Sequence, residues 1–464
     1  MTMSTDISTN ETDMADMLAG LRRMHATGRT RTLEWRTAQL EGLIRFLRER
    51  EAEIAQALAS DLGRSSFESW FGDVAPPKGE AEVALKNLRR WMRPQNRRVP
   101  LAQMPARARI QYEPLGVVLI IGPWNYPMNL SLAPMVAALA AGNCVVLKPS
   151  ELAPAASRLL AEVFPDYLDR DAVAVVEGDS VVTQRLLSLG FDHAFFTGGT
   201  EIGRKVMEGA ASTLTPVTLE LGGKSPAIVM GDADLDVVAR RIAWVKLINS
   251  GQTCIAPDYV LVEESVKETL IDKLRSALRA FTAEETGGKK IVNRRQFDRL
   301  AGYLEQTKGT VVEGGVSDAE ALTIAPTILV DPASDEPAMM EEIFGPILPV
   351  KGFRDIDEVL GFVNGRPKPL GLYVFARDRD VADRLVNAIP AGGAVINHCA
   401  LHYLIPSLPF GGVGASGMGA YHGEWGFQTF SHRKAVAVKG FKPDFAITYP
   451  PYGDKAMALM RRLF

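Results

Sequence analysis

The stretch LGVVLII (residues 115–121) decides the fold, because it is an uninterrupted apolar run that ends in the loop GPWNYP (residues 122–127). A run of this length, bounded by glycine and proline, is typical of a strand buried on both faces. A helical stretch follows to Ala141, and a second apolar strand-like run begins at Cys144. This order predicts a parallel sheet with helices packed on its faces.

Two further units repeat the pattern of strand, loop and helix. Val173 to Glu177 and His193 to Thr197 are strand-like, and a helical stretch near Val181 to Leu189 lies between them. The repetition is typical of an α/β doubly wound sheet, which binds its ligand at the carboxyl ends of the strands. At 464 residues the chain is too long for one ordinary core. We therefore predict a cofactor-binding domain over residues 1–220 and a second α/β catalytic domain over residues 221–428.

A small bridging element is predicted from two outlying segments. Residues 97–113 are basic and contain prolines, so we expect them to project from the cofactor domain as an arm. Residues 429–464 hold an alternating, strand-like run at Ser431 to Gly440, followed by a tail with apolar residues near two arginines. The tail is much too short to span a membrane, so no stable membrane span is expected.

Charge and cysteine usage exclude several functions. The 52 basic and 55 acidic residues give a net charge of −3, which does not indicate a nucleic-acid partner. Three widely spaced cysteines, at 144, 254 and 399, do not form a disulfide framework, and Met1 to Asp16 is polar rather than signal-like. We expect a cytoplasmic location. His398 to His402 contains metal-ligand residue types without a second ligand pair, so it is predicted to line a pocket or loop, and no metal site is expected.

The candidate nucleophile is Cys254, in the polar stretch NSGQTC (residues 249–254). It lies between a helix-like segment at Leu235 to Ile248 and a strand-like one at Asp258 to Glu263, which places it on a connection. Connections on rigid elements often carry catalytic groups. On this stretch alone, a lone cysteine is more typical of a small, buried and inert hydrophobe, so the assignment depends on its companions elsewhere.

A candidate phosphate site follows one strand. Gly198 to Gly203 opens a helix, and the amides of a helix N-terminus suit a pyrophosphate. Thr200 occupies the position of the middle glycine, so the match to the dinucleotide fingerprint is partial. A complete G-x-G-x-x-G at residues 412–417 follows no strand, and we predict an irregular loop there that packs between domains.

The candidate general base is Glu220. Its apolar, strand-like context would raise the pKa of the carboxyl towards the range useful at neutral pH. Two alternatives remain open. Glu220 stands at a distance from the glycine turn that suits a ribose-binding acid, and an ion pair with Lys224 would make it a structural residue.

Six motifs follow one another along the chain, namely GPWNYP (residues 122–127), KPSE (148–151), FTGGTEIG (196–203), LELGGK (219–224), GQTC (251–254) and EIFGP (342–346). Together, over roughly residues 15–450, they resemble the aldehyde dehydrogenase superfamily. The runs at residues 255–260 and 408–423 are similar to those of the class 3 enzymes. Residues 282–290 are shorter than the family pattern suggests, which affects a surface loop and no catalytic position.

The resemblance implies Cys254 as nucleophile, Glu220 as general base and Asn125 as the side-chain donor of an oxyanion hole. It also implies a set of cofactor-binding residues: Trp124 lining the cleft, Lys148 and Glu151 on the adenosine ribose, Gly198, Gly199 and Gly203 at the pyrophosphate, and Glu342 and Phe344 on the nicotinamide ribose. The implied reaction oxidises an aldehyde to a carboxylic acid with NAD, or alternatively NADP.

The resemblance also implies a homodimer, in which the strand at residues 431–440 joins the arm at a subunit contact. Four side chains, Tyr126, Leu130, Trp244 and Tyr403, suggest an apolar or aromatic substrate entrance and an apolar, aromatic or medium-chain aldehyde. Two other functions are weighed against this one. A cysteine-dependent esterase or amidase would use Cys254 without a nucleotide, and a non-catalytic structural protein would only bind one.

Overall fold

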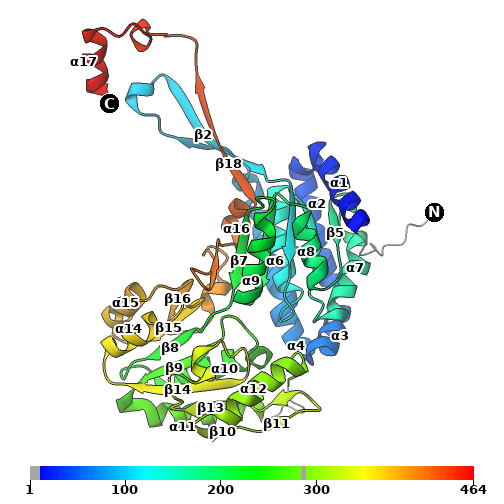
Figure 1. Cartoon of the computed structure of the whole chain (residues 1–464), viewed down its shortest axis with the longest axis vertical. Helices are drawn as coiled ribbons and strands as arrows, with labels where there is room; N and C mark the ends of the chain where they lie inside the picture. Colours follow the sequence, from blue (N-terminus) through cyan, green and yellow to red (C-terminus); the bar gives the residue numbers. More distant parts are fainter. Residues whose placement is uncertain (1–10, 284–288, 464) are drawn as a thin grey trace, which may run out of the picture.

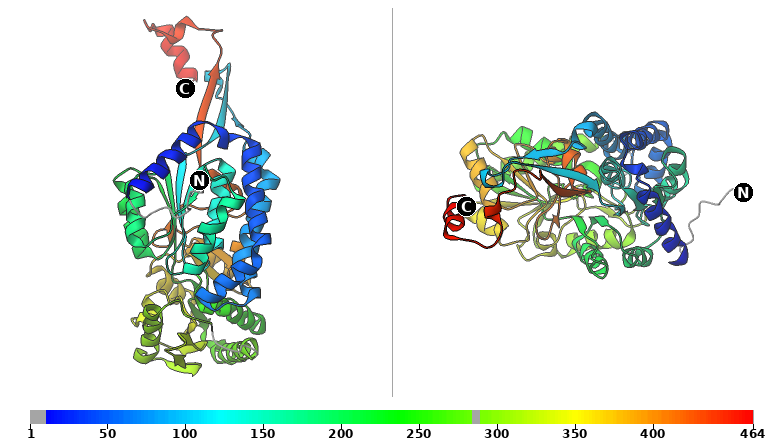
Figure 2. Two further views of the ribbon diagram at one scale, coloured as in Figure 1. Left: turned by 90° about the vertical axis from the view of Figure 1, so that its right-hand side faces the viewer. Right: turned by 90° about the horizontal axis from the view of Figure 1, so that it is seen from above.

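Two mostly parallel sheets form the body of the molecule, and a thin arm projects from one end (Figure 1). The structure is a computed structural model and describes residues 11–283 and 289–463. Of the stretch 282–290, residues 284–288 lie outside the described part, as do residues 1–10 of the polar amino-terminal stretch. The predicted α/β class is confirmed, since helices cover both faces of the first sheet (Figure 2).

The first sheet has the strand order β17-β7-β6-β3-β4-β5, and only β17 is antiparallel to its neighbour. Its strands are β3 (Val117–Ile121), β4 (Cys144–Lys148), β5 (Val173–Val175), β6 (His193–Gly198), β7 (Val217–Leu221) and β17 (Gly417–Met418). The connecting helices are α6 (Asn129–Ala141), α7 (Pro154–Tyr167), α8 (Ser180–Ser188) and α9 (Thr200–Ala211). The strand, loop and helix units predicted from the apolar runs are all present.

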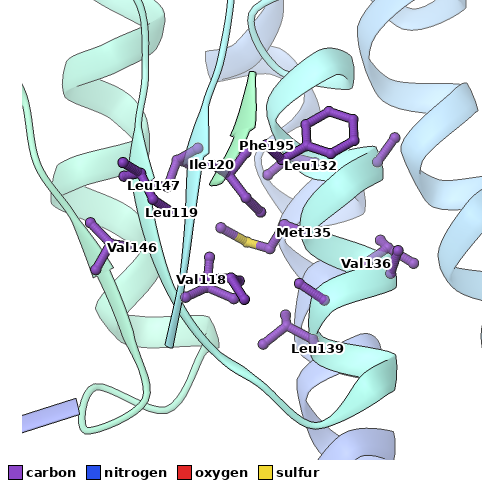
Figure 3. Close-up of a cluster of buried hydrophobic side chains, with 14 of the residues drawn as sticks. Val118, Leu119, Ile120, Leu132, Met135, Val136, Leu139, Val146, Leu147 and Phe195 are labelled. Carbon is purple, nitrogen blue, oxygen red and sulfur yellow. The ribbon is translucent and has the colours of Figure 1, made fainter. Parts of the chain in front are cut away.

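Helix α6 occupies the centre of this first core. Every one of its residues is buried, which explains why the segment is apolar on all sides rather than on one stripe. Val118 and Ile120 on β3 lie against Leu132, Met135 and Leu139 on α6 (Figure 3). The amino-terminal helices are α1 (Glu11–Ala26), α2 (Leu33–Glu49), α3 (Glu51–Leu62), α4 (Ser66–Ser69) and α5 (Ala75–Trp91). Of these, α2 and α5 pack directly on α6, while α1 contacts β3 and β4, and α3 contacts α7.

The second sheet has the order β10-β13-β14-β9-β8-β15-β16. Its strands are β8 (Pro226–Val229), β9 (Tyr259–Glu263), β10 (Thr310–Glu313), β13 (Thr327–Val330), β14 (Ile347–Phe353), β15 (Gly371–Phe375) and β16 (Gly393–Ile396), with a separate pair β11 (Ser317–Asp318) and β12 (Thr323–Ile324). Its helices are α10 (Leu235–Leu247), α11 (Lys267–Thr282), α12 (Arg294–Gln306), α13 (Pro337–Met340), α14 (Ile356–Asn364) and α15 (Arg379–Ala388). Helix α10 and strand β9 are the two elements predicted to flank Cys254.

After β16 the chain returns to the first sheet. Helix α16 (Gly423–Thr429) contacts α5 and α6, and Phe410, Tyr421, Phe427 and Phe430 are buried in the same core as β3 and β6. The glycine-rich loop makes this return feasible, because a Cβ on Gly417 would lie 2.2 Å from the carbonyl oxygen of Leu219. Residues 410–428, grouped by sequence with 221–428, therefore pack with the cofactor-side sheet.

The projecting arm is a three-stranded antiparallel sheet of β1 (Gln95–Arg97), β2 (Ala106–Pro114) and β18 (Ser431–Lys439). Strand β18 pairs with β2 along its whole length, from Ser431 opposite Pro114 to Lys439 opposite Ala106. The predicted joining of the late strand to the arm is confirmed within the chain. Helix α17 (Asp454–Leu463) follows near the arm (Figure 1), and no helix in the described ranges is long and apolar enough to cross a membrane.

Candidate active site

Cys254 follows a strained connection at the end of α10. Asn249, Ser250 and Gly251 have φ angles of 51°, 55° and 72°, so three successive residues adopt left-handed conformations. A Cβ on Gly251 would lie 2.2 Å from the carbonyl oxygen of Gly345, so only glycine fits there. These turns direct Cys254 away from the helix axis and place it at a pocket between the two sheets.

Asn125 reaches this connection from the loop after β3. Its side-chain Nδ2 donates to the carbonyl oxygen of Gln252 at 3.1 Å, and Asn249 Nδ2 donates to the Asn125 carbonyl oxygen at 3.0 Å. The next residue adds a third link, since the Tyr126 hydroxyl lies 2.7 Å from Thr253 Oγ1. The side-chain amide of Asn125 is therefore held at Gln252, which lies two residues before Cys254 on the loop that carries the cysteine.

Glu220 lies on β7 with its side chain fully inside the protein. Neither carboxylate oxygen has a hydrogen-bond partner among the residues that the structure describes, and burial raises the pKa of this carboxyl well above its usual value. The alternative of an ion pair with Lys224 is wrong. Lys224 Nζ instead lies 2.5 Å from Asp258 Oδ2 and donates to the Ala338 carbonyl oxygen at 2.7 Å. The ammonium group is therefore bound by other acceptors.

The Cys254 thiol holds its proton more tightly than a free thiol does. Burial, the largest cause, together with the nearby carboxyl groups of Glu342 and Glu220, raises its pKa to about 12. Both carboxyl groups therefore act on the sulfur. Burial also raises the pKa of Glu342, to about 8, with a smaller contribution from Asp258. A group that takes the thiol proton is required for nucleophilic attack.

An apolar pocket leads to Cys254. All four predicted entrance residues line it. His398 and Cys399 line it too, so the segment from His398 to His402 contributes to a pocket wall, as predicted. The lining residues include Phe71, Tyr126, Leu130, Trp244, His398, Cys399, Tyr403 and Phe410. Within the described ranges, no group of three or more His, Cys, Asp and Glu side chains could hold a metal ion. Phe71 was not predicted as a pocket residue. It lies on a π-helical turn at Trp70–Val74, and no local sequence pattern indicates that it faces a pocket.

A second set of predicted residues lies close together. The rings of Trp124 and Phe344 contact edge to face, with centroids 5.4 Å apart. Glu342 is half-buried, its Oε1 is enclosed and unpartnered by any described residue, and a Cβ on Gly222 would lie 2.0 Å from its Oε2. A buried acceptor without a partner is costly, and it suits a ligand hydroxyl.

A third set of predicted residues lies at the carboxyl ends of β4 and β6. Lys148 Nζ pairs with Glu151 Oε2 at 2.8 Å. Gly199 caps helix α9 without a side-chain bond, and no atom lies within 4 Å of a Cβ built on it. Gly203 packs the helix closely on the sheet, since its Cβ would meet Leu221 at 2.6 Å. An uncapped helix N-terminus with free space fits a pyrophosphate, so the residues present fit a dinucleotide.

Comparisons with known proteins agree with this geometry. A model described as the aldehyde dehydrogenase family matches residues 5–436. Aldehyde dehydrogenase family 3 member B1 of Homo sapiens is 47% identical, over 96% of each chain. The solved substrate-bound state of Staphylococcus aureus AldH has a TM-score of 0.93 and 39% identity, covering 97% of this chain and 99% of that one. An NAD-dependent aldehyde dehydrogenase from Sinorhizobium meliloti has a TM-score of 0.85 and 27% identity, covering 94% and 89%.

The chain belongs to the aldehyde dehydrogenase family, and it is similar to class 3 members. It is an NAD(P)-dependent enzyme that oxidises an aldehyde. Neither the esterase or amidase nor the non-catalytic structural protein is favoured by any of these comparisons.

Replacing Glu220 with glutamine should change how stability depends on pH. Because the folded pKa of Glu220 is raised, its carboxyl favours folding below its ordinary pKa of 4.5, and this contribution is lost as pH rises towards the folded value. The variant has no such loss, so its free energy of unfolding should increase relative to wild type between about pH 5 and 8, by up to about 1.4 kcal/mol per pH unit, and its melting temperature should increase with it. Calorimetry across this range measures the difference, and a constant offset would contradict the buried, neutral carboxyl.

Proposed function

We propose that Cys254, Asn125 and Glu220 form the catalytic group. One observation carries this proposal: a half-buried thiol and an unpartnered buried carboxyl group lie close enough for the carboxyl group to raise the thiol pKa, beside the Asn125 amide, which is hydrogen-bonded from its own loop to the loop of the thiol. A nucleophile, a base and an oxyanion donor at one pocket are the groups that acyl chemistry requires.

The three residues then divide the steps of the reaction. Glu220 takes the thiol proton, directly or through water, and Cys254 Sγ bonds to the aldehyde carbon. Asn125 Nδ2 and the Cys254 amide stabilise the negative oxygen, an effect typically worth about 3 to 4 kcal/mol. The bound dinucleotide supplies the hydride acceptor. After its first proton has passed to solvent, Glu220 removes a proton from the water that attacks the thioester carbon. The acid is released, and the proton on Glu220 returns to the leaving sulfur and restores the thiol.

The cofactor proposal assigns positions on the two sides of the cleft. Lys148 and Glu151 hold the adenosine ribose, Gly198, Gly199 and Gly203 face the pyrophosphate, and Glu342, Phe344 and Trp124 surround the nicotinamide ribose. Lys148 and Glu151 form one ion pair, so both charges lie close to a bound 2′-phosphate. The Glu151 carboxylate would repel that phosphate, and the Lys148 ammonium would attract it. We therefore propose a preference for NAD with measurable use of NADP.

The substrate proposal follows from the pocket. Its lining side chains are chiefly aromatic or aliphatic, so a charged or strongly polar aldehyde would lose its hydration without compensation. An apolar, aromatic or medium-chain aldehyde is favoured. Turnover of a graded aldehyde panel, with absorbance of the reduced cofactor as the signal, tests both the reaction and this order.

Quaternary structure and location are also proposed. Strand β18 pairs with β2 on one side only, and its other edge has no strand partner in the described part of the chain. An unpaired edge on a projecting sheet is suited to a second copy, which supports a homodimer. A cytoplasmic location suits the three free cysteines, because the Cys254 mechanism needs a reduced thiol.

Cys254→Ala should abolish aldehyde oxidation, by at least about 10³-fold in kcat, while NAD binding stays nearly unchanged. Cys144 provides the matched control, since it is fully buried in β4 and distant from the pocket lining. Cys144→Ala should lower the melting temperature and keep near-normal kcat. The reverse pattern in the two variants would refute the nucleophile assignment.

Glu220→Gln should separate the two halves of the reaction. It keeps the side-chain size but accepts no proton, so deacylation should slow by about 10²- to 10⁴-fold. Rapid mixing with aldehyde and NAD should give a burst of reduced cofactor approaching one per subunit, with acyl-enzyme visible by intact mass. A raised cofactor KM with unchanged turnover would instead identify Glu220 as the ribose ligand.

Glu151→Gln should shift cofactor choice towards NADP, because it removes the carboxylate that opposes a 2′-phosphate. The ratio of kcat/KM for NAD to that for NADP should fall by about tenfold, the effect of about 1.4 kcal/mol. A strong native preference for NADP would be incompatible with the role proposed for Glu151.

A further inference from the structure

Arg64 is a buried cation that contacts three separate parts of the active site. It follows α3 and its helix-ending residue Gly63, and its side chain is 2% exposed. Its Nε donates to Asn249 Oδ1 at 3.0 Å, one terminal nitrogen donates to Asp73, and the other donates to the carbonyl oxygen of Asn125. Its guanidinium also covers the ring of Tyr126, 4.4 Å from the centroid.

Asp73 extends this contact to the start of α6. While one oxygen accepts from Arg64, the other accepts from the backbone amides of Met128 and Asn129 at 2.9 and 3.0 Å. The middle and the far end of the loop between β3 and α6 are thus fixed: Arg64 binds the carbonyl of Asn125, and Asp73 binds the amides three and four residues later. Asn129 in turn donates to the Tyr403 hydroxyl at 2.7 Å, in the pocket wall.

The orientation of the Asn125 side chain depends on its own backbone. Its carbonyl oxygen accepts from both Arg64 and Asn249, which fixes the peptide plane, and its side-chain amide then points to the carbonyl oxygen of Gln252. The same Asn249 also donates to the Gln252 carbonyl at 3.0 Å. Arg64 therefore bonds to the peptide of the oxyanion donor and to the left-handed turn before the nucleophile.

We propose that Arg64 is a positioning residue of this enzyme: through Asn125 and Asn249 it sets the distance between the oxyanion donor and Cys254, and it touches neither substrate nor cofactor. The proposal rests on the oxyanion role proposed for Asn125. Asp73 neutralises the guanidinium and holds it in place, because a buried cation without a counter-ion would be strongly unfavourable.

The geometry requires arginine in particular. A planar guanidinium presents donors at fixed angles and can reach Asn249, Asp73 and Asn125 together, whereas an ammonium is a point charge on a flexible chain. Small misplacements of a catalytic donor are expensive, and about 1 Å can reduce the rate about 10²-fold.

Arg64→Met should reduce kcat by about 10- to 100-fold, with KM for NAD and aldehyde changed by less than about threefold. The rate of Cys254 alkylation by iodoacetamide should stay within about threefold of wild type, because alkylation builds no oxyanion. Arg36→Met is the matched control. Arg36 is also buried and donates to the Ala140 carbonyl at 3.0 Å, away from the pocket lining, so its loss should lower the melting temperature and leave kcat near wild type.

A double mutant decides whether Arg64 acts through Asn125. Asn125→Ala alone should reduce kcat by about 10²- to 10³-fold, and adding Arg64→Met should reduce it little further. Multiplicative losses, or an Arg64→Met enzyme with normal kcat beside an impaired Asn125→Ala enzyme, would overturn the positioning role. Normal kcat in Asn125→Ala would instead overturn the oxyanion assignment, and this inference with it.

If Arg64→Met does not fold, Arg64→Lys is the alternative variant, because it keeps the positive charge. It should retain the cofactor affinity of the wild type and still lose about fivefold to tenfold in kcat, with the same lack of additivity on Asn125→Ala. Wild-type kcat in the lysine variant at a lowered melting temperature would reduce Arg64 to a structural ion-pair residue.

Discussion

The active site depends on the hydrogen bonds that join the two α/β units. The loop after β3 belongs to the first sheet and the turn after α10 belongs to the second. The Asn125 side chain donates across them to Gln252, and the Asn249 side chain donates back to Asn125. Neither sheet contains the proposed nucleophile and the proposed oxyanion donor together. Catalytic geometry therefore exists only when both units are folded and packed, so their packing contributes to function as well as to stability.

Desolvation determines the protonation states in this cleft. Glu220 is buried and Cys254 and Glu342 are half-buried, and each has a pKa raised mainly by burial. A neutral thiol beside carboxyls of raised pKa does not react indiscriminately with electrophiles, since the thiolate is the reactive form. The same burial makes Glu220 a stronger proton acceptor than an exposed glutamate, so one physical effect restrains the nucleophile and strengthens its base.

The elements that depend on local sequence patterns could be predicted. The strands β3 and β4, helix α10 and the connection that carries Cys254 each have their own hydrophobic pattern, and the site residues stand in short motifs. The partner of Lys224 was not predictable, because Asp258 lies on another element and comes close only in the folded chain. Arg64 and Asp73 gave no signal for the same reason. Their polar neighbourhood resembles an ordinary surface turn, and only the tertiary structure shows that they are buried.

Residues 410–439 also bear on the order in which the protein is made. Strand β17 completes the edge of the first sheet beside β7, α16 covers α5 and α6, and β18 pairs with β2, so the amino-terminal unit needs the last part of the chain. The second sheet needs only residues 226–396, which the ribosome finishes earlier. During synthesis the second sheet can therefore fold before the first sheet is complete. Until the last part of the chain is made, an apolar surface on α6 stays uncovered, and a chaperone could bind there.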